Sequence, residues 1–451
     1  MLNIKATHPD YDNWIDAWQL MRDAYDVEAV QQEGEKYLPR PSGFSELHDP
    51  DEAYRAYKNR AEVPDLLAPT VRGMVGVMHR KEASIELPEA LEPLRERATR
   101  DGLTLDALHR RINRELLQTG RYGLLGDIRS GGAPYIAGYT AESIRNWDED
   151  EEQNLDFLVL DESAPARSQE SGEWHHQHRY RKLEMVGGTY QATIHEQNAS
   201  GSFSEGDPVE ALGPGRRALD FIPFVFVNTN DLTPQPEEVP LYGVAKAVVA
   251  VYRLDADHRR LLFLTANPQH IVTGVHKDDA PGVIGGGLWV FEDPSSDAKI
   301  LEFTGAGSEA FERKIQAETE KAIEVGARLM QDGQESGEAL RIRMASQTAT
   351  LTSIAKSAAA GLERVLRHLA LWVGANPDEV VVTPNLEFFE SVLSTQEVRD
   401  LVEAWQKQGM SFDSLFHNMK KGGRVPEDRT PEEEIELIEQ QGPVLGFLGR
   451  D

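Results

Sequence analysis

Apolar residues recur at helical spacing through the first quarter of the chain. A helix is predicted over residues 12–31, because its large apolar side chains fall at i, i+4, i+7 and i+11, on one face: Trp14, Trp18, Met21 and Tyr25. Residues 54–79 show the same spacing, with Pro69 expected in a first helical turn. A third helix is predicted over residues 103–119, and Gly120 is placed to end it.

The pattern changes between residues 122 and 227. Short stretches rich in β-branched and aromatic residues alternate there with turn-forming residues, which is typical of strands. The predicted strands are 122–128, 135–139, 157–160, 178–184, 190–196 and 221–227. The polar segment 161–173 is expected to be a hairpin tip or mobile loop, and 198–216 a similar insert. This part of the chain predicts a mixed α/β domain with a mostly antiparallel sheet.

Helical spacing returns after residue 240. Three long helices are predicted, over 241–264, 308–330 and 339–373. The Gly- and Pro-rich segment 267–303 separates the first two, with short strands near 287–291 and 299–303. A polar break at 331–337 separates the last two. The third helix is rich in small residues, and Gly361 is expected to allow a bend.

The C-terminal segment predicts a strand and then short helices. The strand covers 380–383. Ser394 and Glu397 form a capping box for a helix that ends near 408, and another helix is expected over 411–420. Thr430 is placed as the N-cap of a last acidic helix, with Pro431 in its first turn.

Composition limits the class of protein. A chain of 451 residues predicts two or three domains. With 47 basic and 76 acidic residues, the formal net charge is −29, which opposes tight binding to nucleic acid or anionic membranes. The absence of cysteine excludes disulfides and thiolate metal sites and favours a reducing compartment. The longest apolar runs are too short to cross a bilayer, so we expect a soluble protein with no membrane contact.

Three motifs suggest chemistry, and each has a simpler interpretation. His175, His176 and His178 could offer two imidazoles on one strand face to a metal, although a half-exposed strand explains them as well. Gly285–Gly287 lacks the Lys-Ser/Thr of a phosphate loop and favours a tight turn. The acidic run Asp148–Glu152 is typical of a solvated loop, with a weak cation site as the alternative. We predict no catalytic residue, cofactor or bound metal.

The predicted helix 308–330 combines a narrow apolar seam with many charges. It is either a solvent-exposed surface helix or one of several helices that together form the wall of a ring, with its acidic positions facing a channel. The candidate channel-facing residues are Glu309, Glu312, Glu318, Glu320 and Glu324.

The order of these elements and several short sequence segments resemble those of bacteriophage portal proteins. The segments are residues 14–25 leading to 34–39, and residues 101–105, 120–125, 222–225, 267–269 and 335–341. The resemblance covers about residues 14–440. It implies an α+β fold made of a mixed α/β wing (1–240), a first stem helix (241–264), a β-containing clip (265–307), a second stem helix (308–330), a tunnel loop (331–338), a long wing helix and strand (339–393) and a helical crown and tail (394–451).

The resemblance also implies the function. Portal proteins form a ring of about twelve subunits at one capsid vertex of the virion, assembled in the host cytoplasm. Double-stranded DNA passes through the ring, and terminase, capsid and tail or adaptor proteins dock on it. The residues carried over as the tunnel loop facing the DNA are Gln331, Asp332, Gly333, Gln334, Glu335 and Ser336. Residues 331–340 contain no Lys or Arg, so we expect weak contact with DNA that depends little on salt.

Two other functions remain open from the sequence. One is a metal-dependent hydrolase that uses the strand His175–His178 and nearby carboxylates. The other is a monomeric acidic adaptor for capsid proteins. A ring predicts a particle of several hundred kilodaltons, whereas both alternatives predict a much smaller one.

Overall fold

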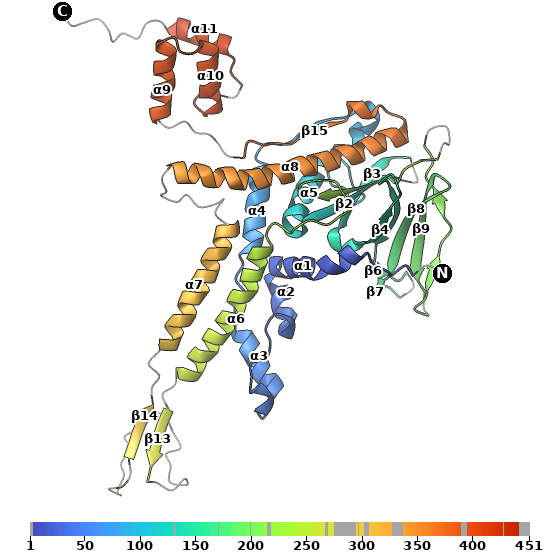
Figure 1. Cartoon of the computed structure of the whole chain (residues 1–451). Coiled ribbons are helices and arrows are strands. Elements are labelled where there is room, and N and C mark those ends of the chain that lie inside the picture. Colours follow the sequence, from blue (N-terminus) through green and yellow to red (C-terminus); the bar gives the residue numbers. More distant parts are fainter. Residues whose placement is uncertain are drawn as a thin grey trace, which may run out of the picture. The chain divides into compact units, whose positions relative to one another are not determined.

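The computed structural model shows an α+β protein that divides into two units, residues 1–385 and 386–451. It describes residues 3–129, 132–169, 171–198, 200–213, 218–266, 269–274, 295, 297–301, 306–326, 337–388, 395–426 and 428–441. Figure 1 shows the elements of the chain. The tunnel-loop residues 331–336, Gly285–Gly287 and Ser394 lie outside the described residues.

Five helices precede the first large sheet. They are α1 (Pro9–Tyr25), α2 (Val27–Gln32), α3 (Pro50–Arg60), α4 (Leu67–Met78) and α5 (Leu105–Thr119). The single helix predicted over 12–31 is wrong, because Asp26 leaves the helical conformation and its side chain caps α2 by accepting the Glu28 N–H at 3.2 Å. Pro69 does lie in the first turn of α4. Gly120 ends α5 as predicted, in the left-handed conformation with φ 73°.

The strands form antiparallel sheets, as the sequence predicts. The three-stranded sheet has the order β12-β2-β3, and the six-stranded sheet has β10-β9-β8-β5-β4, with β11 also paired to β9. The strand bounds are β1 Ser84–Glu86, β2 Arg121–Ile128, β3 Pro134–Thr140, β4 Ile144–Glu149, β5 Leu155–Asp161, β6 Ala164–Arg167, β7 Trp174–Gln177, β8 Arg179–Val186, β9 Thr189–Gln197, β10 Phe203–Glu205, β11 Val209–Glu210, β12 Phe224–Asn228, β13 Gln269–Thr273, β14 Asp297–Leu301 and β15 Val381–Thr383.

Two differences from the predicted strands have local causes. β12 begins at Phe224 rather than at residue 221, directly after Pro223, which has no N–H to donate to a ladder. The acidic run at 148–152 was expected to be a loop, but Asp148 and Glu149 end strand β4 and pair with β5. The alternation in β4 is hard to detect, because its buried side chains are Ile144 and Trp147, and a register shift lies between residues 144 and 146.

The long helix α8 (Gly337–Val373) packs across the three-stranded sheet. A Cβ atom built on Gly361 would lie 2.5 Å from Cγ2 of Val227 in β12, and one on Gly126 of β2 would lie 3.0 Å from Cδ2 of Leu369. Glycine at these positions therefore lets the helix approach the strands closely. The helix runs unbroken through Gly361, so this residue serves packing rather than the predicted bend.

We expect Gly361→Ala to lower the free energy of unfolding by up to about 2 kcal/mol. The added methyl meets the stiff, fully buried Val227, and overpacking of this kind costs about 1–3 kcal/mol, which exceeds the gain of about 1 kcal/mol from replacing a helical glycine. Gly76→Ala in α4 is the matched control, because nothing lies within 4 Å of its added Cβ. Urea denaturation should show Gly76→Ala as neutral or stabilising; equal effects of the two changes would contradict the packing role.

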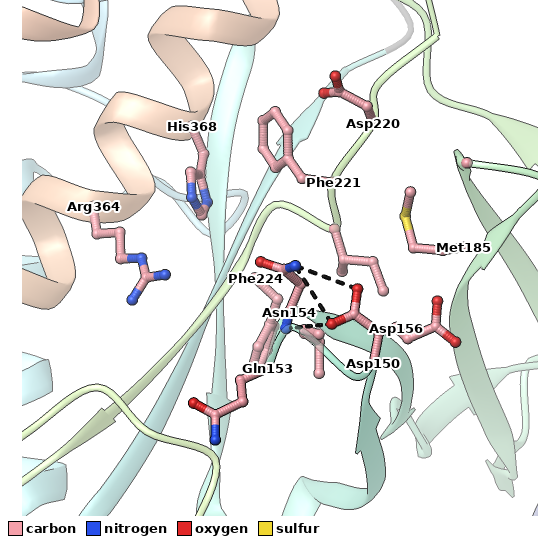
Figure 2. A pocket seen from close by; sticks show the side chains of 13 residues that line it. Asp150, Gln153, Asn154, Asp156, Met185, Asp220, Phe221, Phe224, Arg364 and His368 are labelled. Carbon is pink, nitrogen blue, oxygen red and sulfur yellow. Dashed lines mark hydrogen bonds between the residues drawn. The ribbon is translucent and has the colours of Figure 1, made fainter.

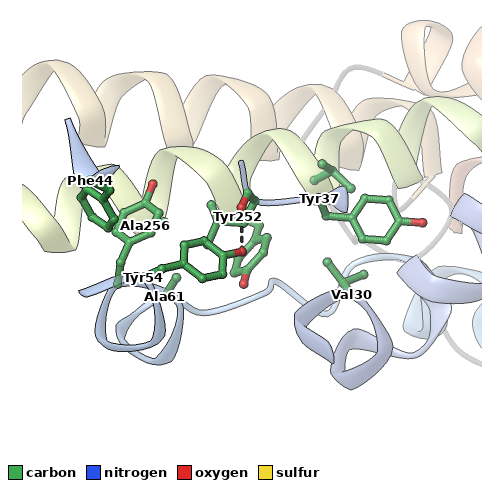
Figure 3. Packing of buried hydrophobic residues seen from close by; sticks show 10 residues of the cluster. Val30, Tyr37, Phe44, Tyr54, Ala61, Tyr252 and Ala256 are labelled. Carbon is green, nitrogen blue, oxygen red and sulfur yellow. Dashed lines mark hydrogen bonds between the residues drawn. The ribbon is translucent and has the colours of Figure 1, made fainter. Parts of the chain in front are cut away.

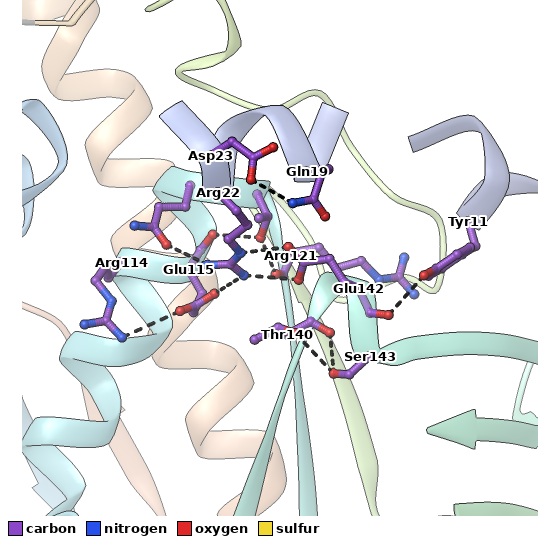
Figure 4. Close-up of polar contacts among 12 residues, drawn as sticks. Tyr11, Gln19, Arg22, Asp23, Arg114, Glu115, Arg121, Thr140, Glu142 and Ser143 are labelled. Atoms are coloured by element: carbon purple, nitrogen blue, oxygen red, sulfur yellow. Dashed lines mark hydrogen bonds and ion pairs between the residues drawn. The ribbon is translucent and has the colours of Figure 1, made fainter. Parts of the chain in front are cut away.

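A partly buried ion cluster ties α1 to α5 and to the short helix η4 (Ala141–Ser143) (Figure 4). Arg22 donates to Glu115 Oε2 at 2.6 Å, to Glu142 Oε1 at 2.7 Å and to Gln118 Oε1 at 2.7 Å. Burial alone would raise the pKa of Glu142, but the hydrogen bond and charge of Arg22 outweigh it and lower that pKa. One guanidinium therefore holds three elements that are distant in the sequence.

The described residues of the unit 386–451 form three short helices, α9 (Thr395–Gln406), α10 (Phe412–Lys421) and α11 (Pro431–Gln441). Each matches a predicted helix. Ser411 caps α10 by accepting the Ser414 N–H at 3.1 Å. Thr430 caps α11 by accepting the Glu433 N–H at 3.2 Å, while Glu433 accepts the Thr430 N–H at 2.9 Å, so this helix begins with a complete capping box.

Candidate functional site: the paired helices α6 and α7

Helix α6 (Tyr242–Thr265) is fixed to the N-terminal helices by an aromatic cluster (Figure 3). Tyr252 and Ala256 of α6 are fully buried within it, together with side chains from residues 30–61. Two hydrogen bonds also fix the orientation of α6: Tyr57 donates to Asp257 Oδ1 at 2.7 Å, and Arg253 Nε donates to the Tyr37 carbonyl at 2.6 Å. The helix predicted over 241–264 is therefore confirmed and forms the anchored member of the pair.

Helix α7 (Ala306–Gly326) packs against α6. The C-terminal part of α6 and the N-terminal part of α7 meet in a joint, so the two helices run antiparallel. His258 of α6 lies 2.8 Å from the Ser308 hydroxyl, and its ring stacks on Phe311 with centroids 5.8 Å apart and planes 18° apart. The apolar seam that the sequence predicts on α7 consists of Phe311, Ile315, Ala322, Val325 and Leu329. Phe311 and Ile315 are half-buried and Ala322 is buried, whereas the side chains of Val325 and Leu329 lie outside the described part of the chain.

Three of the five candidate carboxylates share the outward face of α7. Glu320 follows Glu309 by eleven residues, and Glu324 follows Glu320 by four. At about 3.6 residues per turn, both spacings bring the side chain back to the same face of the helix. All three are exposed. Arg313 lies on the same face, 3.5 Å from Glu309, and Gln316 donates to Glu320 at 2.9 Å. The outward face is thus acidic with one guanidinium, and we call Glu309, Glu320 and Glu324 the acidic stripe.

The other two candidates lie elsewhere on the helix. Glu312 is turned toward α6, where its carboxylate lies 3.8 Å from His258 Nε2. Glu318 is on the opposite flank and accepts a hydrogen bond from Lys314 at 2.7 Å, which lowers its pKa. Its side chain is 19% exposed, whereas that of Glu309 is 74% exposed. The sequence spacing shows which glutamates share a face of α7. It does not show which of those faces packs against α6, and so it could not tell which glutamates face outward.

The structure also places the other candidates from the sequence. Of the segment 265–307, the described parts include β13 and β14, which pair antiparallel with Gln269 opposite Leu301. His175 and His176 lie exposed on β7, and the ring of His176 meets that of His178 edge-on at 4.7 Å. Among the described residues, no group of three or more His, Asp or Glu side chains is arranged to hold a metal ion.

A cavity that the sequence did not predict lies where α8 meets three strand connections (Figure 2). Its volume is about 470 Å³, and α8 contributes Arg364 and His368 to its wall. The other lining residues include three carboxylates and an apolar set: Asp150, Asp156, Asp220, Met185, Phe221, Ile222 and Phe224. Because its walls come from four separate segments, no local motif in the sequence could have revealed it.

No membrane-crossing helix is found in the described parts of the chain, where every helix is too short or too polar for one.

Comparison with known proteins gives one family match and distant structural similarities. The model of a family described as a domain of unknown function (DUF4055) matches residues 240–373, a span that begins just before α6 and ends with α8. No curated protein matches the chain. One similar solved structure is a chain of the neck of a native GTA particle computed with C12 symmetry, with 14% identity, a TM-score of 0.38 and coverage of 77% of this chain and 87% of that one. Another is a chain of the neck of an empty GTA particle computed with C6 symmetry, with 13% identity, a TM-score of 0.38 and coverage of 86% and 94%.

Proposed function

We propose that this protein is a portal subunit, which forms a closed ring at one vertex of a bacteriophage capsid and conducts double-stranded DNA during packaging and ejection. The observation that carries the proposal is the α6–α7 pair: one helix is anchored in the aromatic cluster, and the other presents the acidic stripe to solvent. We propose a structural role rather than an enzymatic one, with terminase, capsid and tail proteins docking on the ring.

The packing of α7 supports association with further copies. Among its described side chains only Ala322 is buried, and its seam residues Phe311 and Ile315 are half-buried against α6. A charged helix with so little covered surface gains most of its stability from neighbours. Copies arranged side by side around an axis would supply these neighbours for every subunit.

The acidic stripe supports a passage that DNA crosses without being held. Phosphate groups bind chiefly to Lys and Arg, with release of counterions, so a wall of carboxylates offers the duplex few strong contacts. The chain carries a net charge of −29, and a ring of such chains repels the phosphate backbone from all sides. DNA would therefore slide along the axis rather than adhere to the wall.

The direct test is the mass of the purified protein by light scattering, with negative-stain images. A closed ring of about twelve copies of this 50.4 kDa chain predicts a particle of roughly 600 kDa with a central opening. A monomer or dimer over the micromolar range would reject the proposal.

Reversing the charge of the acidic stripe should strengthen binding to DNA. We expect the triple variant Glu309→Lys, Glu320→Lys and Glu324→Lys to bind duplex DNA at least about tenfold more tightly than the wild type, because each new ammonium can pair with a phosphate. Fluorescence anisotropy at several salt concentrations measures the affinity and its salt slope, which should steepen in the variant.

The matched control changes charge equally on the exposed residues Glu28, Glu46 and Asp65, each replaced by Lys. Its effect on DNA affinity should be much smaller. Equal gains for both triple variants would mean that net charge, rather than the position of the stripe, governs the contact.

A further inference from the structure

The two sides of helix α7 carry opposite charge. Phe311, which stacks on His258, and the more deeply buried Ile315 and Ala322 mark the side of α7 that faces α6. The residue before each of these three and the residue after it lie about 100° to either side, because an α-helix turns once in about 3.6 residues. The preceding residues, which we call the basic flank, are Ala310, Lys314 and Lys321. The following residues, which we call the acidic flank, are Glu312, Gln316 and Ile323.

The lysines of the basic flank are only partly neutralised within the chain. Lys314 is exposed and donates to Glu318 at 2.7 Å, a carboxylate on the same side of the helix. Lys321 is also exposed, and no hydrogen-bond or ion-pair partner of its ammonium lies among the described residues. On a chain with a net charge of −29, an exposed lysine without a carboxylate partner is available to a partner of opposite charge.

Helix α6 adds two cations on the same side. Leu261 marks that side of α6, because a Cβ atom built on Gly307, two helical turns before the first lysine of the basic flank, would lie 3.4 Å from its Cδ2. Lys246 and Arg253 lie within about 80° of Leu261 around the helix. Both are exposed, and neither pairs with a carboxylate among the described residues. Asp257 also lies on this side, but it already accepts a tyrosine hydroxyl at 2.7 Å, so cations dominate the side.

The acidic flank offers the complementary charge. Glu312 is exposed, and within the described part of the chain no lysine or arginine pairs with it. Gln316 donates to Glu320 at 2.9 Å, which holds a carboxylate of the acidic stripe beside this flank. Arg259 of α6 lies on this side, but it already pairs with Asp255 at 2.8 Å. The unpaired charge of this flank is therefore negative.

The complementary groups also lie at matching heights. The contact between His258 and Ser308 fixes the level of the two antiparallel helices, and both rise about 1.5 Å per residue. Arg253 is therefore level with the turn of α7 that contains Glu312 and Lys314. Subunits of a closed ring are related by rotation, so surfaces at the same height along the axis meet.

The end of α6 exposes two leucines that fit the same arrangement. Leu264 is 55% exposed and Leu262 is 44% exposed. Two residues turn a helix by about 200°, so these side chains point to opposite sides, with Leu264 on the side of the basic flank. Copies that stand side by side cover both leucines at once.

We propose that the basic flank of one subunit packs against the acidic flank of the next subunit, with Lys314 and Arg253 of one copy facing Glu312 of its neighbour. The inference rests on the proposed ring and assigns its subunit contact. The two flanks are different surfaces, and contact between different surfaces joins copies head to tail, which closes into a ring when the rotation permits. The acidic stripe lies between the flanks and remains open toward the channel.

Two charge-reversal variants test the contact, alone and mixed. Lys314→Glu with Lys321→Glu makes both flanks acidic, and Glu312→Lys with Gln316→Lys places lysines on both flanks. Each double variant alone should raise the protein concentration at half-assembly at least about tenfold, because like charges then meet. An equimolar mixture should assemble near the wild-type concentration, since the two kinds of chain can alternate around the ring. Sedimentation velocity measures the assembled fraction in each sample.

The matched control is Arg55→Glu with Arg110→Glu, at two exposed positions outside the flanks. It changes the net charge as much as the double lysine reversal but should leave the concentration at half-assembly unchanged. Repulsion between chains of charge −29 makes the opposite prediction for Glu312→Lys with Gln316→Lys, which would then assemble more readily than the wild type. That result would overturn the pairing of the flanks. Far-ultraviolet circular dichroism confirms that each variant folds.

The two hypotheses fail differently. A ring-mass particle that neither double variant weakens would overturn the flank contact and leave the ring, and it is the result expected if another protein covers the flanks. Folded variants that fail to assemble and are not rescued by mixing would also overturn the head-to-tail contact. A wild-type monomer at all concentrations would reject the ring itself.

Discussion

Replacing Arg22 with methionine is expected to lower the free energy of unfolding of the unit 1–385 by about 3–5 kcal/mol. Methionine keeps most of the side-chain volume but leaves Glu115 and Glu142 without their shared cation. The Glu115 side chain is 7% exposed and that of Glu142 21%, so water cannot replace the lost hydrogen bonds fully. Urea denaturation followed by circular dichroism measures the change.

The loss should be smaller at pH 5 than at pH 7. Arg22 holds the pKa of Glu142 below its ordinary value against the effect of burial. Without the guanidinium, burial raises the folded-state pKa above that of the unfolded chain, and protonation then relieves the unpaired charge as the pH falls. The triple variant Arg22→Met, Glu115→Gln, Glu142→Gln should recover part of the stability, since it buries no unpaired charge.

Arg110→Met provides the control for the loss of an ion pair. Arg110 and Asp106 pair at 3.1 Å on the surface of α5, where such contacts contribute less than about 1 kcal/mol. Similar losses for Arg22→Met and Arg110→Met would contradict the structural role of the Arg22 cluster.

The second large effect is expected from acid. His79 and His109 meet edge-on at 4.9 Å between α4 and α5. Burial lowers the pKa of His79 to about 4 and that of His109 to about 3. Asn113 Nδ2 lies 2.9 Å from His79 Nε2, a hydrogen bond that the neutral ring accepts. Neither nitrogen of His109 has a partner among the described residues. Both rings are therefore neutral in the folded protein at pH 7.

The sign of the effect follows from proton binding. Each histidine takes up a proton near pH 6.5 in the unfolded chain but only near pH 3–4 in the folded one. Below pH 6.5 the unfolded state binds more protons than the folded state. The free energy of unfolding therefore decreases as the pH is lowered, by up to about 1.4 kcal/mol per pH unit and per histidine, until the folded-state pKa is reached. Urea midpoints measured from pH 7 to pH 4.5 should decline accordingly.

His109→Phe isolates this contribution. The variant should flatten the pH dependence by up to about 1.4 kcal/mol per unit, because one proton-binding difference is removed. His48→Gln, at an exposed position, should leave the slope unchanged. A slope in His109→Phe equal to that of the wild type would show that the buried pair does not govern the acid response.

The existence of most helices and strands could be predicted because their signals are local. Apolar spacing in 105–119, the left-handed glycine at 120 and the cap at Thr430 act through neighbouring backbone groups, and each was confirmed in place. The break at Asp26 was missed because side-chain spacing continues across it while the backbone does not. Strand β4 was missed because its buried side chains are widely spaced and a register shift interrupts their alternation.

The candidate site was predictable only in part. The sequence alone selected a charged helix near 308–330 with five glutamates and a narrow seam. It could not assign Glu312 to the joint with His258 or Glu318 to a flank beside Lys314, because those assignments depend on which side of α7 meets α6. The cavity beside α8 also arises only where distant segments meet.

The sequence by itself determined the α+β class, the order of the elements and the acidic character of α7, since periodicity, capping and charge are properties of short stretches of chain. The tertiary structure decided which carboxylates face outward, why glycine is needed at 361, and which buried charges find a partner. Those outcomes depend on contacts between residues far apart in the sequence, such as His258 with Ser308, Arg22 with Glu115 and Gly361 with Val227, and no local pattern encodes them.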